Sequence, residues 1–103
     1  MSRPYSGAFL RELSANPSDG LGVELAKICV DANLSAVHIA TALEVSRNTV
    51  YSWFRGQGVH ENKRKKIESL ISLIQQDTRE GLLPAKSLKE AKKYIESIIG
   101  VPV

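Results

Sequence analysis

The 103-residue sequence predicts an all-α fold, a small bundle of about five helices. Apolar residues recur at the three-to-four-residue period of a helix along most of the chain. Serines stand where these stretches begin, and glycines stand where they end. No apolar–polar alternation is long enough to predict a strand. The composition, 43% hydrophobic and 24% charged, is that of an ordinary globular domain with one modest core.

The same composition excludes several classes of protein. The apolar runs are only a few residues long, so we expect no membrane-spanning segment. The first residues lack the apolar core of a secretory signal. The single cysteine, Cys29, cannot form an internal disulfide, which fits a reducing compartment. We therefore expect a cytoplasmic protein.

The chain opens with a leader, residues 1–19, that predicts at most a short helix or an arm. Phe9, Leu10 and Leu13 fit one apolar helical turn, which is too short to define an element. The leader ends in the sequence Ser-Ala-Asn-Pro-Ser-Asp-Gly, which is typical of a loop. The first well-defined helix is predicted over residues 20–33, and its apolar stripe is Leu21, Leu25, Ile28 and Cys29.

Two short helices follow, and each begins after a serine. Ser35 is the expected N-cap of a helix over residues 36–43, and Ser46 is that of a helix over residues 47–55. Gly56 ends the second of them. Because only a few residues connect these two helices, they must lie close together.

A fourth helix is predicted over residues 61–79 and a fifth over residues 88–99. The apolar stripe of the fourth is Ile67, Leu70, Ile71 and Ile74. Ser87 and Glu90 form a capping box, Ser-x-x-Glu, at the start of the fifth. The expected organisation is a leader, a central domain and a C-terminal segment, with the ranges 1–19, 20–80 and 81–103.

The net charge of +3 is concentrated in one part of the chain. Residues 1–46 carry three bases and five acids, and residues 67–103 carry five of each. Residues 47–66 carry six bases and one acid, a net charge of +5. A basic block of this kind favours an anionic partner.

The segment 35–56, with the sequence SAVHIATALEVSRNTVYSWFRG, carries the most specific pattern. At about 100° per residue, Val50, Trp53 and Phe54 fall on one face of helix 47–55 and are predicted to pack inward. The opposite face is polar and consists of Arg47, Asn48, Tyr51, Ser52 and Arg55. A helix fits the major groove of B-DNA, where Arg and Asn side chains pair with guanine and adenine edges.

This segment resembles the helix-turn-helix of the lambda-repressor-like (Cro/repressor-type) DNA-binding domains. The resemblance is clearest over residues 35–56, extends over 21–75, and rests on Ile39, the small Ala40, Leu43, Val45, Ser46, Val50 and the ending Trp53-Phe54-Arg55-Gly56. The chain differs from the family at Glu44, where a turn glycine is common. Because a left-handed conformation there costs a non-glycine residue about 1 kcal/mol, we expect a slightly different turn. The chain also differs at Phe54, which replaces an acid, and at Ala36, where many members have a phosphate-contacting glutamine.

The resemblance implies a sequence-specific double-stranded DNA-binding protein, a transcriptional repressor or activator that inserts helix 47–55 into the major groove. Such a protein is expected at the nucleoid. The expected base contacts are Arg47, Asn48, Tyr51 and Ser52. The expected phosphate contacts are the backbone amides of Ser35 and Ala36 and the side chains of Arg55, Lys63, Arg64 and Lys65.

Two other functions stay open at this point. The motif also suits a DNA-packaging or replication accessory protein, as in small terminase subunits. It also suits a protein-interaction module that binds no DNA. The outward face of helix 47–55 carries Arg47, Asn48 and Arg55 without an acid, which favours DNA.

A homodimer is expected, because such modules usually bind two half-sites. Its surface is either the last helix, with Leu88, Ile95, Ile98 and Ile99, or the leader, with Tyr5, Phe9 and Leu10. The alternative is that both segments only complete the core of one chain.

No pattern predicts catalysis, a metal, a cofactor or a small-molecule ligand. The chain has no glycine-rich phosphate loop and no clustered acid pair. His38 and His60 are 22 residues apart and the chain has no second cysteine beside Cys29, so a zinc site is not expected. We expect Trp53 in the core rather than in a ligand site, and Cys29 as a small buried hydrophobe.

Overall fold

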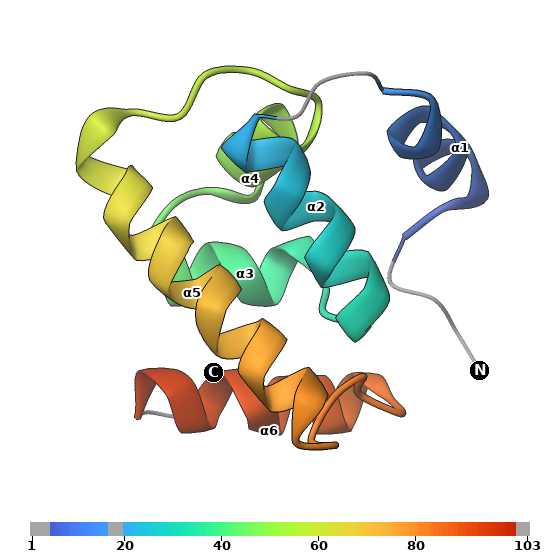
Figure 1. Ribbon diagram of the computed structural model, residues 1–103, viewed down its shortest axis with the longest axis vertical. Coiled ribbons are helices and arrows are strands. Elements are labelled where there is room, and N and C mark those ends of the chain that lie inside the picture. Colours follow the sequence, from blue (N-terminus) through green and yellow to red (C-terminus); the bar gives the residue numbers. More distant parts are fainter. Residues whose placement is uncertain (1–4, 17–19, 101–103) are drawn as a thin grey trace.

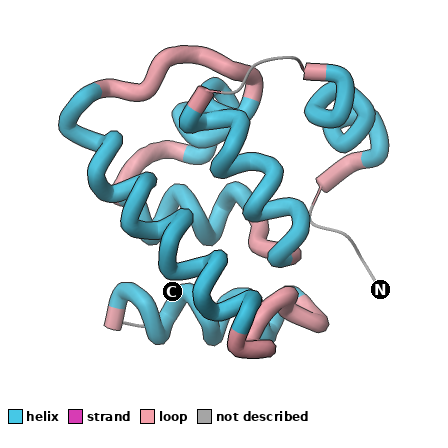
Figure 2. Tube along the Cα trace, viewed as in Figure 1, coloured by secondary structure: helices cyan, strands magenta, loops and turns pink. Residues whose placement is uncertain are grey.

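The computed structural model describes residues 5–16 and 20–100, and within these ranges it has six helices and no strand (Figures 1 and 2). The helices are α1 (Gly7–Ala15), α2 (Leu21–Ala32), α3 (Ala36–Leu43), α4 (Arg47–Phe54), α5 (Glu61–Arg79) and α6 (Leu88–Ile99). The predicted all-α fold is confirmed. The five predicted helices correspond to α2–α6, and α1 is a sixth.

Helix α1 turns the leader into a longer element than the sequence pattern suggested. Its first turn is capped by Ser6, whose hydroxyl accepts a 3.1 Å hydrogen bond from the amide of Phe9. The loop predicted from Ser14 begins instead at Asn16, and part of that predicted loop, residues 17–19, lies outside the described residues. A helix this short needs tertiary packing for its stability, and a local pattern does not report such packing.

The serine caps predicted for α3, α4 and α6 are confirmed. The side-chain oxygens of Ser35, Ser46 and Ser87 accept hydrogen bonds from the amide three residues later, at 3.3, 3.1 and 3.1 Å. Each bond satisfies an amide that has no partner within its own helix. The beginnings of these three helices are therefore set by local sequence.

Helices α2 and α3 hold the other elements together. Helix α2 packs against α4 and α5, and α3 packs against both α4 and α6. Figure 1 shows α1 and α4 toward one end of the molecule and α6 at the other, with α3 between α4 and α6. A Cβ built on Gly22 in α2 would lie 2.3 Å from the carbonyl oxygen of Trp53 in α4. The two backbones approach this closely because position 22 has no side chain.

All six helices contribute to one core. Its fully buried side chains include Leu25, Cys29, Ile39, Phe54, Ile67 and Ile95. The predictions that Trp53 and Cys29 belong to the core are confirmed. Burial raises the pKa of the Cys29 thiol far above its usual value, so this cysteine is an unreactive apolar group.

The two segments considered for a dimer surface both pack on the core of their own chain. In the leader, Tyr5 is buried and its hydroxyl donates a 2.6 Å hydrogen bond to the carbonyl of Leu34. In α6, Ala91 and Ile95 are fully buried, whereas Leu88 is 49% exposed. Among the described residues, both segments therefore bury apolar side chains in the core of their own chain.

An aromatic cluster joins α1 to α4. The ring of Phe9 stacks on Tyr5 with 5.2 Å between the ring centroids. The same ring meets Tyr51 edge-on at 5.9 Å and lies 6.1 Å from Phe54. Contacts of this geometry add a modest favourable energy to the apolar area that the rings bury. The leader thereby supports one flank of α4.

Candidate nucleic-acid interface

Helix α4 is built with an inward and an outward face, as the sequence predicts. Val50, Trp53 and Phe54 are buried against α2 and the rest of the core. Arg47 and Asn48, in the first turn, are exposed. Neither side chain has a hydrogen bond or an ion pair within the described residues. The start of α4 therefore presents a guanidinium and an amide to a partner.

The turn between α3 and α4 does not differ in the way that Glu44 leads one to expect, because it keeps the left-handed conformation that usually requires glycine. Glu44 ends α3 in the left-handed region, at φ 59° and ψ 44°. Val45 then donates a 3.0 Å hydrogen bond back to the carbonyl of Ala40. The glutamate thus adopts the conformation of a glycine at a cost of about 1 kcal/mol.

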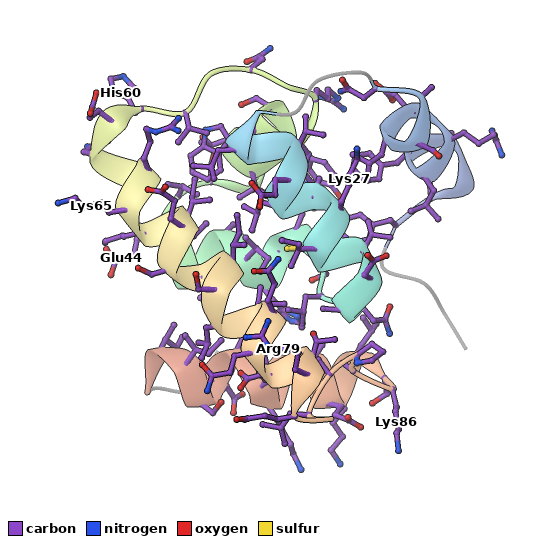
Figure 3. The ribbon with its side chains drawn as sticks, in the orientation of Figure 1. Lys27, Glu44, His60, Lys65, Arg79 and Lys86 are labelled. Carbon is purple, nitrogen blue, oxygen red and sulfur yellow. The ribbon has the colours of Figure 1, made fainter. Side chains whose placement is uncertain are left out.

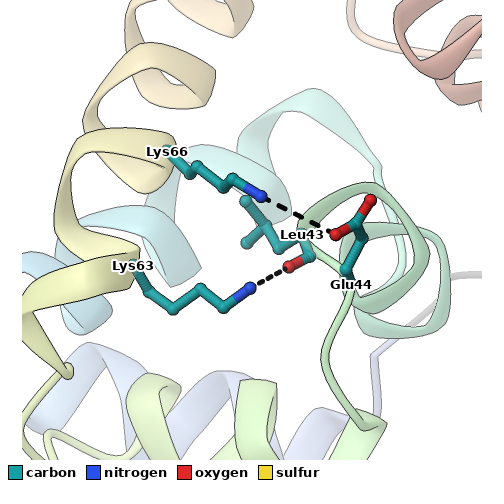
Figure 4. Close-up of polar contacts among 4 residues, drawn as sticks. All are labelled: Leu43, Glu44, Lys63 and Lys66. Carbon is teal, nitrogen blue, oxygen red and sulfur yellow. Dashed lines mark hydrogen bonds and ion pairs between the residues drawn. The ribbon is translucent and has the colours of Figure 1, made fainter.

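Helix α5 holds this turn from the side (Figure 4). The ammonium group of Lys63 donates a 3.0 Å hydrogen bond to the carbonyl of Leu43, at the C-terminus of α3. Lys66 lies 3.7 Å from the carboxylate of Glu44. A cation at the C-terminus of a helix is stabilised by the negative end of the helix dipole. Part of the basic run at the start of α5 is therefore structural.

Of the four predicted base-contact residues, two are exposed and two are engaged within the chain. Arg47 and Asn48 are exposed, as described above. Tyr51 is half-buried because its ring packs against Phe9 and Phe54. Ser52 is also half-buried, and its hydroxyl donates a 2.8 Å hydrogen bond to the carbonyl of Thr49. Arg47 and Asn48 are thus accessible to a partner, whereas Tyr51 and Ser52 make contacts within the chain.

The predicted phosphate-contact residues also divide into two groups. Arg55, Arg64 and Lys65 are exposed, and Figure 3 shows Lys65 extending from α5 away from the core. The guanidinium carbon of Arg55 lies 6.0 Å from the centroid of the Tyr51 ring, which keeps it beside α4. Lys63 is half-buried, and its ammonium group already donates a hydrogen bond to the Leu43 carbonyl, so it is a weaker candidate for a phosphate contact than Arg64 or Lys65.

The phosphate contact predicted at the start of α3 is not supported by the packing. Ala36 is only 1% exposed, which leaves its amide out of reach. The hydroxyl of Ser35 is occupied in capping the amide of His38. The reason is that Ala36 lies on the buried face of α3 together with Ile39, Ala40 and Leu43.

The packing of α6 against α3 forms a pocket that the sequence alone does not predict. It lies between α3 and α6 and is lined by Ser35, His38, Leu88, Lys89 and Lys92. The Nδ1 atom of His38 is buried and makes no hydrogen bond within the described residues. Burial, together with the charge of Lys92, lowers the pKa of His38 below its usual value. The only sequence signal was the three-residue spacing of the two lysines, which places them on one face of α6.

Two further searches cover the described part of the chain. Residues 5–16 and 20–100 contain no cluster of three His, Cys, Asp or Glu side chains arranged to hold a metal ion. Every helix in the same ranges is too short or too polar to cross a membrane. Comparisons of the chain with protein families, with curated proteins and with solved structures find no match.

Proposed function

We propose that the protein binds double-stranded DNA by placing the first turn of α4 in the major groove, as a sequence-specific regulator of transcription. The observation that carries the proposal is the state of Arg47 and Asn48. Both side chains are exposed and unpartnered at the start of a helix whose other face is firmly packed. Arginine pairs bidentately with guanine and asparagine with adenine in that groove.

The charges beside α4 suit a duplex. Arg55, Arg64 and Lys65 are exposed and have no ion pair within the described residues. Salt bridges to acids of the same chain therefore do not compete with an external anion. Contacts from such side chains to phosphates position a protein on the duplex, whereas contacts to base edges select the sequence.

We also propose that the protein acts as a homodimer. A dimer would place two copies of α4 on two half-sites about 34–36 Å apart. Tyr5 and Ile95 are buried in their own chain, and among the described residues of α1 and α6 the large apolar side chain that is exposed is Leu88. Light scattering at several protein concentrations tests this, and a strictly monomeric protein, alone and on duplex DNA, contradicts it. A DNA-bound role also places the protein at the nucleoid.

Binding-site selection from a random duplex library tests the DNA proposal. The wild-type protein should enrich a defined sequence, and Arg47→Ala should weaken binding to that sequence by about 1–3 kcal/mol and relax the preference at one position. Arg64→Ala and Lys65→Ala should instead weaken binding to all sequences and lower the salt slope by about 1 each. Their matched control is Lys27→Ala, because Lys27 is an exposed lysine of α2 that lines a hollow between α1 and α2, which Asp31 also lines.

Two results contradict the proposal. One is a wild-type protein that binds no duplex at low salt, which would favour the protein-interaction alternative. The other is an Arg47→Ala protein whose selected sequence is that of the wild type, which would remove α4 from base recognition.

A further inference from the structure

The pocket between α3 and α6 has the composition of an anion site. Lys89 and Lys92 come from α6, and His38 and Ser35 come from α3. No acidic side chain lines this pocket among the described residues. Its volume of ≈ 480 Å³ has room for a phosphate group and its remaining water. Three groups that carry or accept positive charge therefore face one open space.

Both lysines are free to bind a ligand. Lys89 and Lys92 are exposed, and within residues 5–16 and 20–100 neither takes part in an ion pair or a side-chain hydrogen bond. In contrast, Lys63 and Lys66 on α5 are bound to the C-terminus of α3. Lys63 and Lys66 therefore have structural partners, whereas the two lysines that line the pocket have none among the described residues.

The distance between the pocket and the start of α4 is close to the width of the major groove. Helix α3 runs from Ser35, at the pocket, to the turn that starts α4, and its eight residues span about 12 Å. The major groove is also about 12 Å wide. When the second helix of such a pair lies in the groove, the first helix crosses the DNA backbone. The N-terminal end of α3, at Ser35, then lies near the DNA strand that borders the groove.

We propose that the α3–α6 pocket binds a backbone phosphate of duplex DNA through Lys89 and Lys92, and that α6 thereby extends the interface beyond α4. This inference rests on the proposed function and adds α6 to it. It replaces the phosphate contact once expected from the amides of Ser35 and Ala36 with one made by side chains of α6. The occupied cap and the buried Ala36 need not move.

The test compares the double variant Lys89→Ala/Lys92→Ala with Lys93→Ala on the duplex selected by the wild-type protein. Lys93 is an exposed neighbour on α6 that does not line the pocket. Affinity is measured by fluorescence anisotropy over a series of salt concentrations. Loss of one phosphate contact should reduce the salt slope by about 0.9 in the double variant. The selected sequence should stay the same, and Lys93→Ala should keep nearly the wild-type slope.

A second measurement reads the pocket directly. The ring protons of His38, followed by NMR across pH, report its pKa with and without the duplex. A phosphate in the pocket favours the charged imidazolium, so duplex binding should raise the pKa of His38. The double variant should show a smaller rise. An unchanged His38 pKa on duplex binding overturns the inference.

The outcomes separate this inference from the proposal on which it rests. If the wild-type protein binds no duplex, the proposed function fails and the pocket assignment fails with it. If Arg47→Ala changes the selected sequence but the double variant keeps the wild-type affinity and slope, the pocket assignment alone fails. The latter result is also the one expected if Leu88 and the lysines serve an acidic protein partner instead.

Discussion

Replacing Gly22 with alanine should force α2 and α4 apart. The added Cβ would lie 2.3 Å from the carbonyl oxygen of Trp53 and 2.8 Å from its carbonyl carbon. Both atoms belong to the backbone, so rotation of a side chain cannot relieve the contact. Overpacking of this kind costs about 1–3 kcal/mol, and the better helix propensity of alanine returns at most about 1 kcal/mol. Because the clash is severe and involves backbone atoms, the upper end of this cost applies, and the free energy of unfolding should fall by about 2 kcal/mol.

Urea denaturation, followed by the fluorescence of the single tryptophan and by circular dichroism, measures this loss. In a thermal melt, the expected decrease in Tm is about 4–8 °C for each kcal/mol. Gly7→Ala is the matched control, because a Cβ there would meet only the end of the Arg11 side chain, at 3.5 Å. That variant should be as stable as the wild type or slightly more stable.

The reasoning is refuted if Gly22→Ala unfolds at the same urea concentration as the wild type, or at a higher one. Such a result would mean that α2 and α4 separate at no cost. The close approach at Gly22 would then have no part in fixing the position of α4.

Three further predictions concern single side chains. Tyr5→Phe removes the buried donor to the Leu34 carbonyl and should lower the free energy of unfolding by about 1–3 kcal/mol, measured with urea. Glu44→Gly removes the left-handed strain but also an exposed ion pair and some chain stiffness. These effects nearly cancel, so the free energy of unfolding in urea should change by at most about 1 kcal/mol, and a clearly larger loss would contradict the strain argument. Because the pKa of His38 is lowered by folding, the unfolded chain binds its proton more readily. Stability should therefore be complete above about pH 6.5 and decrease as the pH falls below that value, and His38→Gln should flatten this dependence in urea midpoints measured across pH.

The sequence was sufficient where a structure is decided by neighbours along the chain. The caps at Ser35, Ser46 and Ser87 act over three residues, and the helices that they open begin where the sequence predicts. The inward face of α4 followed from helical periodicity alone, and Trp53 is buried as expected. The turn at Glu44 was not predicted correctly, because its glutamate suggests a slightly different turn, whereas the chain keeps the left-handed conformation in spite of the cost.

Features that depend on contacts between distant segments could not be predicted. Tyr51 was placed on the outward face of α4 by its angle, but Phe9 of α1 covers its ring. The phosphate contact predicted for the amide of Ala36 depends on how deeply the start of α3 is packed, and Ala36 is buried in the core. The basic run at the start of α5 predicts Lys63 as a phosphate contact. Its actual partner, the Leu43 carbonyl, lies 20 positions away in the sequence, so no local pattern could indicate it.

The short length of α4 limits how far the protein can be reduced. A helix of eight residues does not persist in water by itself, so a peptide copied from residues 46–56 should be a random coil. Its shape depends on Phe9 on one flank and on Gly22 beneath it. The entropy of ordering the backbone that carries Arg47 and Asn48 is therefore lost when the chain folds, and only the entropy of these two exposed side chains is lost when a partner binds. The smallest fragment able to display these two side chains together is the bundle itself.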